Sequence, residues 1–289
     1  MVEEQREKVL ACVDQSSYAN HVTDYAAWAA RRINTSLELL HVIDRHEIPT
    51  SGEDHSGAIG FDAQENLLNK LSSEDESRMR QLREQGRVFL AELRDRATAA
   101  GAPEVDVRQR YGELAETLQE QEDGTQLLVL GRRGKSAETT QRDLGRNVEW
   151  VVRAARKPIL TVTEGFTEPR RVMFAFDGSA VTRRGVQMVA NSALFPGLPI
   201  LLLMSGNVSA DASKKLSWAE KTLRDADYDV TASLLPGDAE SVIASTVKKE
   251  GIDLLIMGAF SHSPLRKLFF GSKTADLLRS SGIPTLLLR

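Results

Sequence analysis

Short apolar runs alternate along the chain with longer stretches whose apolar residues recur at helical spacing. In the first half, five apolar runs predict β-strands at residues 8–13, 37–43, 105–111, 127–130 and 158–162. Between them, helical faces are predicted for Val22, Tyr25, Ala26, Ala29 and Ile33, for the charged stretch 76–99, for a short helix ending at Leu118, and for Val148, Val151, Val152 and Ala155. This alternation is typical of an α/β fold built on a parallel sheet.

The same order of elements begins again after a short linker at residues 165–169. Five further runs predict strands at residues 171–176, 200–204, 230–234, 254–257 and 284–288. Helices are predicted for the face formed by Val186, Val189, Ala190 and Ala193, for residues 213–226, and for the face formed by Val242, Ile243 and Val247. The repetition predicts two tandem α/β domains, at residues 1–164 and 170–289, each with a five-stranded parallel sheet flanked by helices.

One segment of the first half, residues 44–75, has no counterpart in the second half. It is polar, with scattered acidic residues and with Gly52, Gly57 and Gly60. We expect it to form an excursion outside the sheet, either as a structureless segment or as a cover over a cavity or a partner surface.

The composition narrows the class of protein. The chain has 289 residues, of which 41% are hydrophobic and 27% charged, and a net charge of −4, so it carries no overall signature of nucleic-acid binding. Cys12 is the only cysteine, so we expect neither an intrachain disulfide nor a cysteine-based zinc site. Residues 1–8 lack the apolar core of a signal peptide, and no apolar run approaches the ~20 residues of a membrane span, so we expect a cytoplasmic location.

An aspartate and a glycine recur at matching places in the two halves. Asp14 and Asp177 each follow a first strand, and Gly131 and Gly258 each follow or end a fourth strand. In the second half, residues 271–272 form a Gly-Ser pair that opens a helix. Glycine lets the backbone approach a phosphate, and free N–H groups at a helix start point toward an anion. The pattern therefore predicts an anion-binding loop.

A nearby motif points elsewhere but fails its own requirement. Gly134-Lys135-Ser136 looks like the end of a Walker A loop, which needs a glycine five positions before Gly134. Val129 stands at that position, so we do not expect P-loop NTPase chemistry.

These features resemble the universal stress protein family, in its tandem form with two fused domains. The family pattern is a glycine, two residues, a second glycine, nine residues and Gly-Ser or Gly-Thr after the fourth strand, with an aspartate after the first. The resemblance covers nearly all of the chain. It implies Rossmann-like domains of the adenine nucleotide alpha hydrolase type, which in many members bind ATP, with or without Mg²⁺. It also implies that the two domains pack through their last strands as an intramolecular pseudo-dimer, and it allows a homodimer.

The resemblance implies a nucleotide site in the second half. Its residues would be Phe176, Asp177, Met204, Gly258, Ser261, Gly271, Ser272 and Lys273. Asp177 would accept a hydrogen bond from a ribose hydroxyl, Phe176 and Met204 would lie near adenine, and backbone N–H groups of the loop would hold the phosphates. Ser261 replaces the second glycine of the pattern. The alternative is structural: Asp177 and Ser179 cap a helix, and Gly258 forms a tight turn.

The first half matches the family pattern less well. The corresponding residues are Asp14, Val42, Gly131, Gly134, Gly145 and Arg146. Ten residues, not nine, separate Gly134 from Gly145, and Arg146 stands in the Ser/Thr place. Arg132, Arg133 and Lys135 either add positive charge to the loop or form a solvated surface. We therefore expect weaker nucleotide binding in this half.

The remaining candidate residues favour structural roles. His41 and Cys12 are predicted to lie in buried strands, His262 is predicted to be a solvated loop residue, and the tryptophans are predicted to be packing residues. His46 and His55 show no metal-ligand spacing, and no catalytic residue is assigned. The first functional hypothesis is a stress-response protein that binds ATP and acts as a sensor or adaptor. A slow ATPase, and a scaffold that binds a protein or an apolar ligand, are the alternatives.

Overall fold

The structure, a computed structural model, describes residues 7–43, 61–134, 148, 151–152, 154–259 and 282–289, with the backbone alone for 61–75. The first half contains β1 (Lys8–Cys12), β2 (Leu37–Ile43), β3 (Val105–Tyr111), β4 (Thr125–Gly131) and β5 (Ile159–Val162). The second half contains β6 (Val172–Ala175), β7 (Ile200–Ser205), β8 (Val230–Leu235), β9 (Leu254–Gly258) and β10 (Thr285–Leu288). The predicted strands are thus present, in the predicted order.

All ten strands belong to one sheet, in the order β3-β2-β1-β4-β5-β10-β9-β6-β7-β8. Within each half every neighbouring pair is parallel, as the α/β pattern predicts. The two halves meet at β5 and β10, which pair antiparallel with Leu160 opposite Leu286 and Thr161 opposite Thr285. The two five-stranded parallel sheets are therefore continuous with each other.

Helices cover both faces of the sheet. They are α1 (Ala19–Ile33), α2 (Phe61–Ala99), α3 (Leu114–Gln121), α6 (Ala180–Ala190), α7 (Ala210–Asp225) and α8 (Ala239–Glu250). Side chains alternate along β1, so that Val9 and Ala11 lie in the core shared with α1, α2, α6 and α7. Leu10 and Cys12 lie in the opposite core, with α3, α8 and the segment around Val151. Burial raises the pKa of Cys12, which fits the predicted core thiol.

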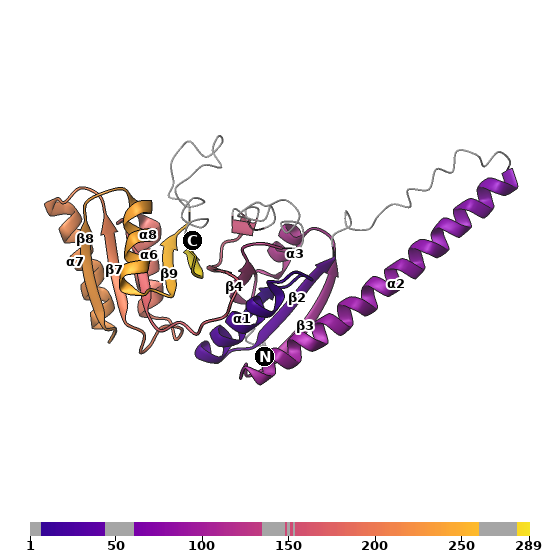
Figure 1. Cartoon of the computed structure of the whole chain (residues 1–289), viewed down its shortest axis with the longest axis horizontal. Coiled ribbons are helices and arrows are strands. Elements are labelled where there is room, and N and C mark those ends of the chain that lie inside the picture. The colour runs from indigo at the N-terminus through magenta and orange to yellow at the C-terminus, as the bar shows by residue number, and fades with distance from the viewer. Residues whose placement is uncertain (1–6, 44–60, 135–147, 149–150, 153, 260–281) are drawn as a thin grey trace, which may run out of the picture.

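Two predictions about helices were wrong. The sequence predicted a helix from residue 76 and an irregular excursion up to 75, whereas α2 begins at Phe61 (Figure 1). Residues 61–85 contain no glycine or proline and are rich in good helix formers, so no residue there interrupts the helix between Phe61 and residue 76. Ala193 was predicted to face the core but is exposed, because α6 ends at Ala190 with Asn191 as its C-cap.

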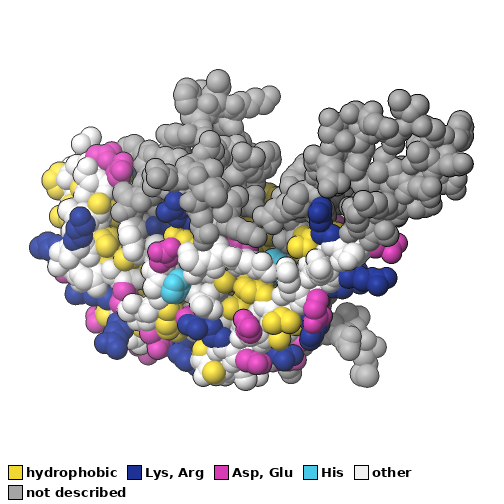
Figure 2. All heavy atoms as spheres, turned by 45° about the vertical axis from the view of Figure 1, so that its right-hand side comes forward, with side chains coloured by type: hydrophobic (Ala, Val, Ile, Leu, Met, Phe, Trp, Pro, Cys, Tyr) yellow, Lys and Arg dark blue, Asp and Glu magenta, His cyan; other side chains and the backbone are white. Residues whose placement is uncertain are grey.

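The surface carries both signs of charge. On the face drawn in Figure 2, Lys and Arg side chains alternate with Asp and Glu side chains, and apolar side chains are scattered among them. That face therefore shows no extended region of one sign of the kind that attracts a nucleic-acid backbone.

Candidate functional site

In each half the chain adds strands first on one side of its first strand and then on the other side. β1 lies between β2 and β4, and β6 lies between β7 and β9, although the chain forms these strands in a different order. In an open parallel sheet, ligands bind in the crevice at the carboxyl ends of the strands at such a switch point. Asp177 lies two residues after the end of β6, and Gly258 ends the adjacent β9, where Ala175 pairs with Met257. The structure thus brings Asp177 and Gly258 together at the switch point of the second half.

Local hydrogen bonds fix the carboxylate of Asp177. Its Oδ1 accepts from the Ser179 backbone N–H at 2.9 Å and from Thr182 Oγ1 at 2.7 Å. Ser179 is the N-cap of α6, and its hydroxyl accepts from the Thr182 N–H. No described residue donates to Asp177 Oδ2, and the side chain is exposed. One oxygen therefore holds the group in place, and the other has no donor among the residues that the structure describes.

The same contacts keep Asp177 ionised. Partial burial acts to raise the pKa of Asp177, but the hydrogen bonds from Thr182 and Ser179 outweigh it, and the pKa falls below the ordinary 3.8. Near neutral pH, Asp177 is a fixed negative charge that accepts hydrogen bonds. That state suits a hydroxyl donor such as a ribose.

Gly258 allows β9 to end against the start of α6. A β-carbon at Gly258 would lie 3.2 Å from Thr182 Cγ2 and 3.5 Å from Val181 Cγ1. Gly131 occupies the matching place in the first half, where a β-carbon would lie 3.0 Å from Tyr18 Cβ. Packing therefore favours glycine at both positions. In each half the end of the fourth strand lies close to the start of the first helix, beside the switch point.

The side chains predicted to lie near adenine are buried in the core next to the site. Phe176 and Met204 are buried in the core, and the Phe176 N–H already donates to the Leu203 carbonyl at 2.8 Å. The matching bond in the first half runs from the Val13 N–H to the Leu40 carbonyl, so His41 takes the place of Met204. Val42, the next residue, is partly buried against the core.

Three residues near the site were missed by sequence reasoning. Trp218 on α7 lies 6.5 Å from the Phe176 ring, and the Arg183 guanidinium lies 6.0 Å from the Trp218 ring centre. Arg183 Nε also donates to the Gly178 carbonyl at 3.0 Å, and the Lys215 stem passes close to Gly178. They belong to two different helices and follow no motif, so only the fold could reveal them. Arg183 and Lys215 thus lie beside Gly178, the residue after Asp177, and the Lys215 ammonium is paired with Asp211 at 2.5 Å.

Several predicted site residues lie outside the described part of the chain. In the second half these are Ser261, Gly271, Ser272 and Lys273, together with His262. In the first half they are Gly145, Arg146 and Lys135. Their roles remain predictions.

In the first half, the loop after β4 covers the aspartate. Ser16 Oγ donates to Asp14 Oδ1, and a β-carbon at Gly134 would lie 2.4 Å from Asp14 Oδ2. Asp14 is half-buried, whereas Asp177 is exposed. Asp14 is therefore less accessible to a ligand than Asp177.

Arg132 does not serve this loop with its charge. Its side chain is buried, and Nη2 donates to Thr285 Oγ1 at 2.8 Å and to the Ile283 carbonyl, both in the second half. Burial lowers the pKa of Arg132 to about 10. Neither alternative predicted for Arg132, a phosphate-loop charge or a solvated surface, holds: the residue joins the two halves.

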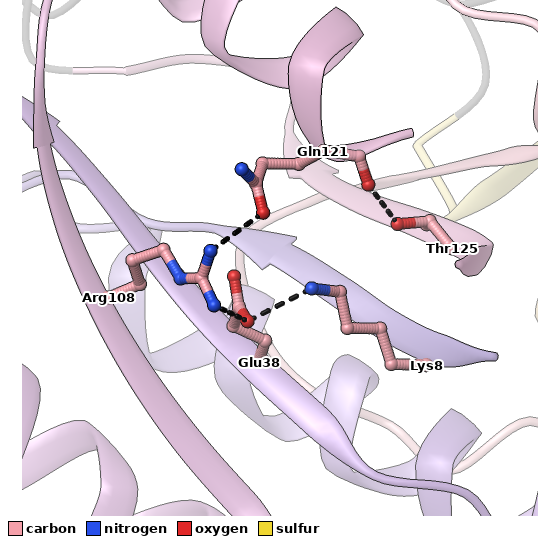
Figure 3. Close-up of polar contacts among 5 residues, drawn as sticks. All are labelled: Lys8, Glu38, Arg108, Gln121 and Thr125. Atoms are coloured by element: carbon pink, nitrogen blue, oxygen red, sulfur yellow. Dashed lines mark hydrogen bonds and ion pairs between the residues drawn. The ribbon is translucent and has the colours of Figure 1, made fainter. Parts of the chain in front are cut away.

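Two other polar clusters lie away from the switch points. Glu38 is buried near the amino end of β2, where it forms ion pairs with Lys8 at 3.0 Å and Arg108 at 3.2 Å (Figure 3). Arg108 also donates to Gln121 at 3.0 Å. His41 Nδ1 lies 3.0 Å from the Val13 carbonyl, and its ring packs edge-on against Phe89. These contacts support structural roles for both groups, as predicted for His41.

Comparison with known proteins identifies the family. Residues 5–163 and 205–289 match the universal stress protein family. The chain is 34% identical over 284 residues to the universal stress protein Slr1230 of Synechocystis sp., covering 97% of this chain and 99% of that protein. The chain therefore belongs to the universal stress protein family.

Solved structures agree on the fold. A universal stress protein from Archaeoglobus fulgidus superposes with a TM-score of 0.69 at 15% identity, covering 98% of this chain and 96% of that one. A functionally unknown protein, PA1789 from Pseudomonas aeruginosa, superposes with a TM-score of 0.60 at 16% identity, covering 98% and 93%. Within the described residues, no helix has both the length and the apolar character needed to cross a bilayer.

Proposed function

We propose that this universal stress protein binds an adenine nucleotide at the carboxyl edge of its second half and acts as a sensor or adaptor. The observation that carries the proposal is the fixed Asp177 carboxylate beside Gly258, with Oδ1 held by Ser179 and Thr182. A ribose hydroxyl can donate to Oδ2 without first reorganising the loop. A hydrogen bond to a charged, preorganised acceptor stabilises binding by about 1.5–3 kcal/mol.

The charges around this carboxylate suit the rest of a nucleotide. Arg183 donates to Gly178 in the loop that holds Asp177, Lys215 passes the same glycine while it pairs with Asp211, and the start of α6 adds a positive helix terminus. We assign the phosphates to the loop from Gly258 through Ser261 to Gly271, Ser272 and Lys273, and we assign ATP, with or without Mg²⁺, as the nucleotide. A bound Mg²⁺ would supply charge neutralisation between phosphate oxygens.

The second half is the stronger site in this proposal. In the first half, Gly134 covers Asp14, and Arg132 is directed toward β10. The antiparallel pairing of β5 with β10 supports the proposal that the two halves stand to each other as a pseudo-dimer. In that arrangement one domain binds nucleotide and the other serves mainly as its partner.

Sensing fits the described site better than fast hydrolysis. Asp177 is engaged by a cap and carries a lowered pKa, so it is a poor general base at neutral pH. Phosphate release that depends on metal and is lost in a Gly271→Val variant would instead support the slow ATPase.

The test begins with the purified chain. It is denatured, and the released small molecules are separated by chromatography, with expected detection of ATP, ADP or AMP. The melting temperature of the nucleotide-free chain is then measured with and without ATP, and ATP is expected to raise it. A chain that releases no nucleotide and melts at the same temperature with ATP would contradict the proposal.

A further inference from the structure

Helix α2 extends well beyond the part of the molecule that supports it. Burial is described from Glu76 onward, and the buried residues in that part of α2 lie toward its carboxyl end, at Gly86, Leu90, Leu93 and Ala97. From Glu76 to Gln85 no side chain is buried. Residues 61–85, here called the overhang, extend the helix by about 37 Å on the amino-terminal side of Gly86, at 1.5 Å per residue. Figure 1 shows α2 continuing past the edge of the sheet.

The sequence of the overhang is amphipathic. Leu68, Leu71, Met79 and Leu82 fall on the same face of the helix as Gly86, Leu90 and Leu93, by their positions at 100° per residue, and Asp75 is the one charged residue among them in the overhang. The sheet and α1 cover that face from Gly86 onward. In proteins most of the stability of a helix comes from packing of its apolar face against another element. The overhang thus continues a packing face beyond the described element that covers it.

Charge divides the same helix into two segments of opposite sign. The acidic segment, 62–76, contains Asp62, Glu65, Glu74, Asp75 and Glu76 and one base, Lys70, which is a net charge of −4. The basic segment, 78–87, contains Arg78, Arg80, Arg83 and Arg87 and one acid, Glu84, which is a net charge of +3. Arg80 and Arg87 are largely exposed, and with the described residues they form short-range ion pairs within the helix.

This division selects one partner and one orientation. Two parallel copies of α2 would place like charges side by side, whereas two antiparallel copies place each acidic segment beside a basic one. With Glu74 of one copy next to Arg78 of the other, Glu65 falls next to Arg87. In the same alignment Leu71 and Leu68 lie level with Met79 and Leu82. An anionic membrane would attract only the basic segment and repel the acidic one.

We propose that a second copy of this chain docks antiparallel on the overhang of α2, with the apolar stripes facing each other and the acidic and basic segments paired. The surface is distinct from the switch points of the sheet. It gives the long helix the packing partner that the described part of a single chain does not provide.

Two charge-reversed forms of the full chain test this inference. One carries Arg78→Glu and Arg87→Glu, which changes the net charge of residues 78–87 from +3 to −1; the other carries Glu65→Lys and Glu74→Lys, which changes the net charge of residues 62–76 from −4 to 0. Analytical ultracentrifugation is expected to show a wild-type dimer that weakens with added salt, and at least about a tenfold higher dimer Kd for each variant alone. An equimolar mixture of the two variants is expected to dimerise again, because every pair is then complementary.

The mixture separates docking from misfolding, since a variant that has lost its helix cannot regain a partner. Circular dichroism of each variant alone checks whether its helical content is kept. A monomeric wild type, a dimer indifferent to both variants, or a mixture that stays monomeric would each overturn the proposal.

Discussion

Arg132 Nη2 donates a hydrogen bond to Thr285 Oγ1 across 2.8 Å and so links the loop after β4 to strand β10 of the other half. The neighbouring Thr161 Oγ1 donates to the Thr285 carbonyl at 3.1 Å across the antiparallel strand pair. A residue of the first glycine loop thus stabilises the junction of the two halves. These two hydrogen bonds add side-chain contacts between the halves to the backbone pairing of β5 with β10.

Replacing Arg132 should weaken the junction. Arg132→Met keeps much of the aliphatic stem but leaves buried acceptors without their charged donor, so we expect the free energy of unfolding to fall by about 2–3 kcal/mol. Urea titration followed by circular dichroism measures this change. Arg156→Met is the matched control, since Arg156 is largely exposed and forms a 3.5 Å ion pair with Glu122, worth about 1 kcal/mol or less. Equal losses in the two variants would contradict a special role for Arg132.

Asp177→Asn should weaken nucleotide binding more than Asp14→Asn. The change leaves the shape of the site but removes the charge that accepts the ribose hydroxyl, and we expect the Kd for ATP to rise about tenfold or more. Asp14 is covered by Gly134, so its replacement should change the overall affinity little. Isothermal titration calorimetry on both variants decides between the halves. A larger loss from Asp14→Asn would move the main site to the first half.

Thr182→Val should produce a pH-dependent loss of stability. The folded-state pKa of Asp177 is lowered, so its contribution is present above the unfolded pKa near 3.8 and is lost as the pH falls through the folded value. Valine keeps the methyl packing near Gly258 and removes the hydroxyl donor. We expect a cost of about 1 kcal/mol at pH 7 that shrinks below about pH 4, as measured by urea titration at both pH values.

Thr246→Val provides the control for that experiment. Thr246 Oγ1 donates to the Val242 carbonyl at 2.7 Å, so its loss involves no titrating acceptor. Its cost should be the same at both pH values. A Thr182→Val cost that is equally constant would show that Asp177 is not the group it stabilises.

Gly185→Ala should destabilise the second half although alanine favours helices. A β-carbon at Gly185 would lie 2.2 Å from Leu288 Cδ1 and 3.2 Å from Phe174 Cζ, both buried. Overpacking of this kind costs about 1–3 kcal/mol, more than the gain of ~1 kcal/mol in helix propensity. Thermal unfolding gives the comparison with Gly282→Ala, where the new methyl would meet nothing within 4 Å. A stability unchanged by Gly185→Ala would mean that Leu288 repacks freely.

The fold was largely predictable because its signals are local. The stretches 37–43 and 105–111 match β2 and β3 residue for residue, and the duplicated order of strands and helices predicts the two parallel halves. The start of α2 was missed because its first turns are mostly polar, and the few apolar residues on one face form too weak a pattern to separate the helix from a loop. The exposure of Ala193 depended on where α6 ends, which is the least predictable feature of a helix.

The site residues that could be predicted from the sequence are those at the ends of strands. Asp177 and Gly258 follow adjacent parallel strands, and the carboxyl ends of such strands share one edge, so their proximity follows from the order of the elements. Arg183, Trp218 and Lys215 come from separate helices whose rotation is set by packing. Arg132 sits in a glycine motif, yet its side chain is directed by a tertiary acceptor far along the chain.

The most direct test is a crystal structure of the full chain grown with ATP and Mg²⁺, refined with the occupancy of each half treated separately. The expected result is nucleotide density in the second half, with a ribose hydroxyl within hydrogen-bond distance of Asp177 Oδ2 and the phosphates against the loop that ends at Gly271 and Ser272. Protein side chains filling that space, with no nucleotide beside Asp177, would contradict it.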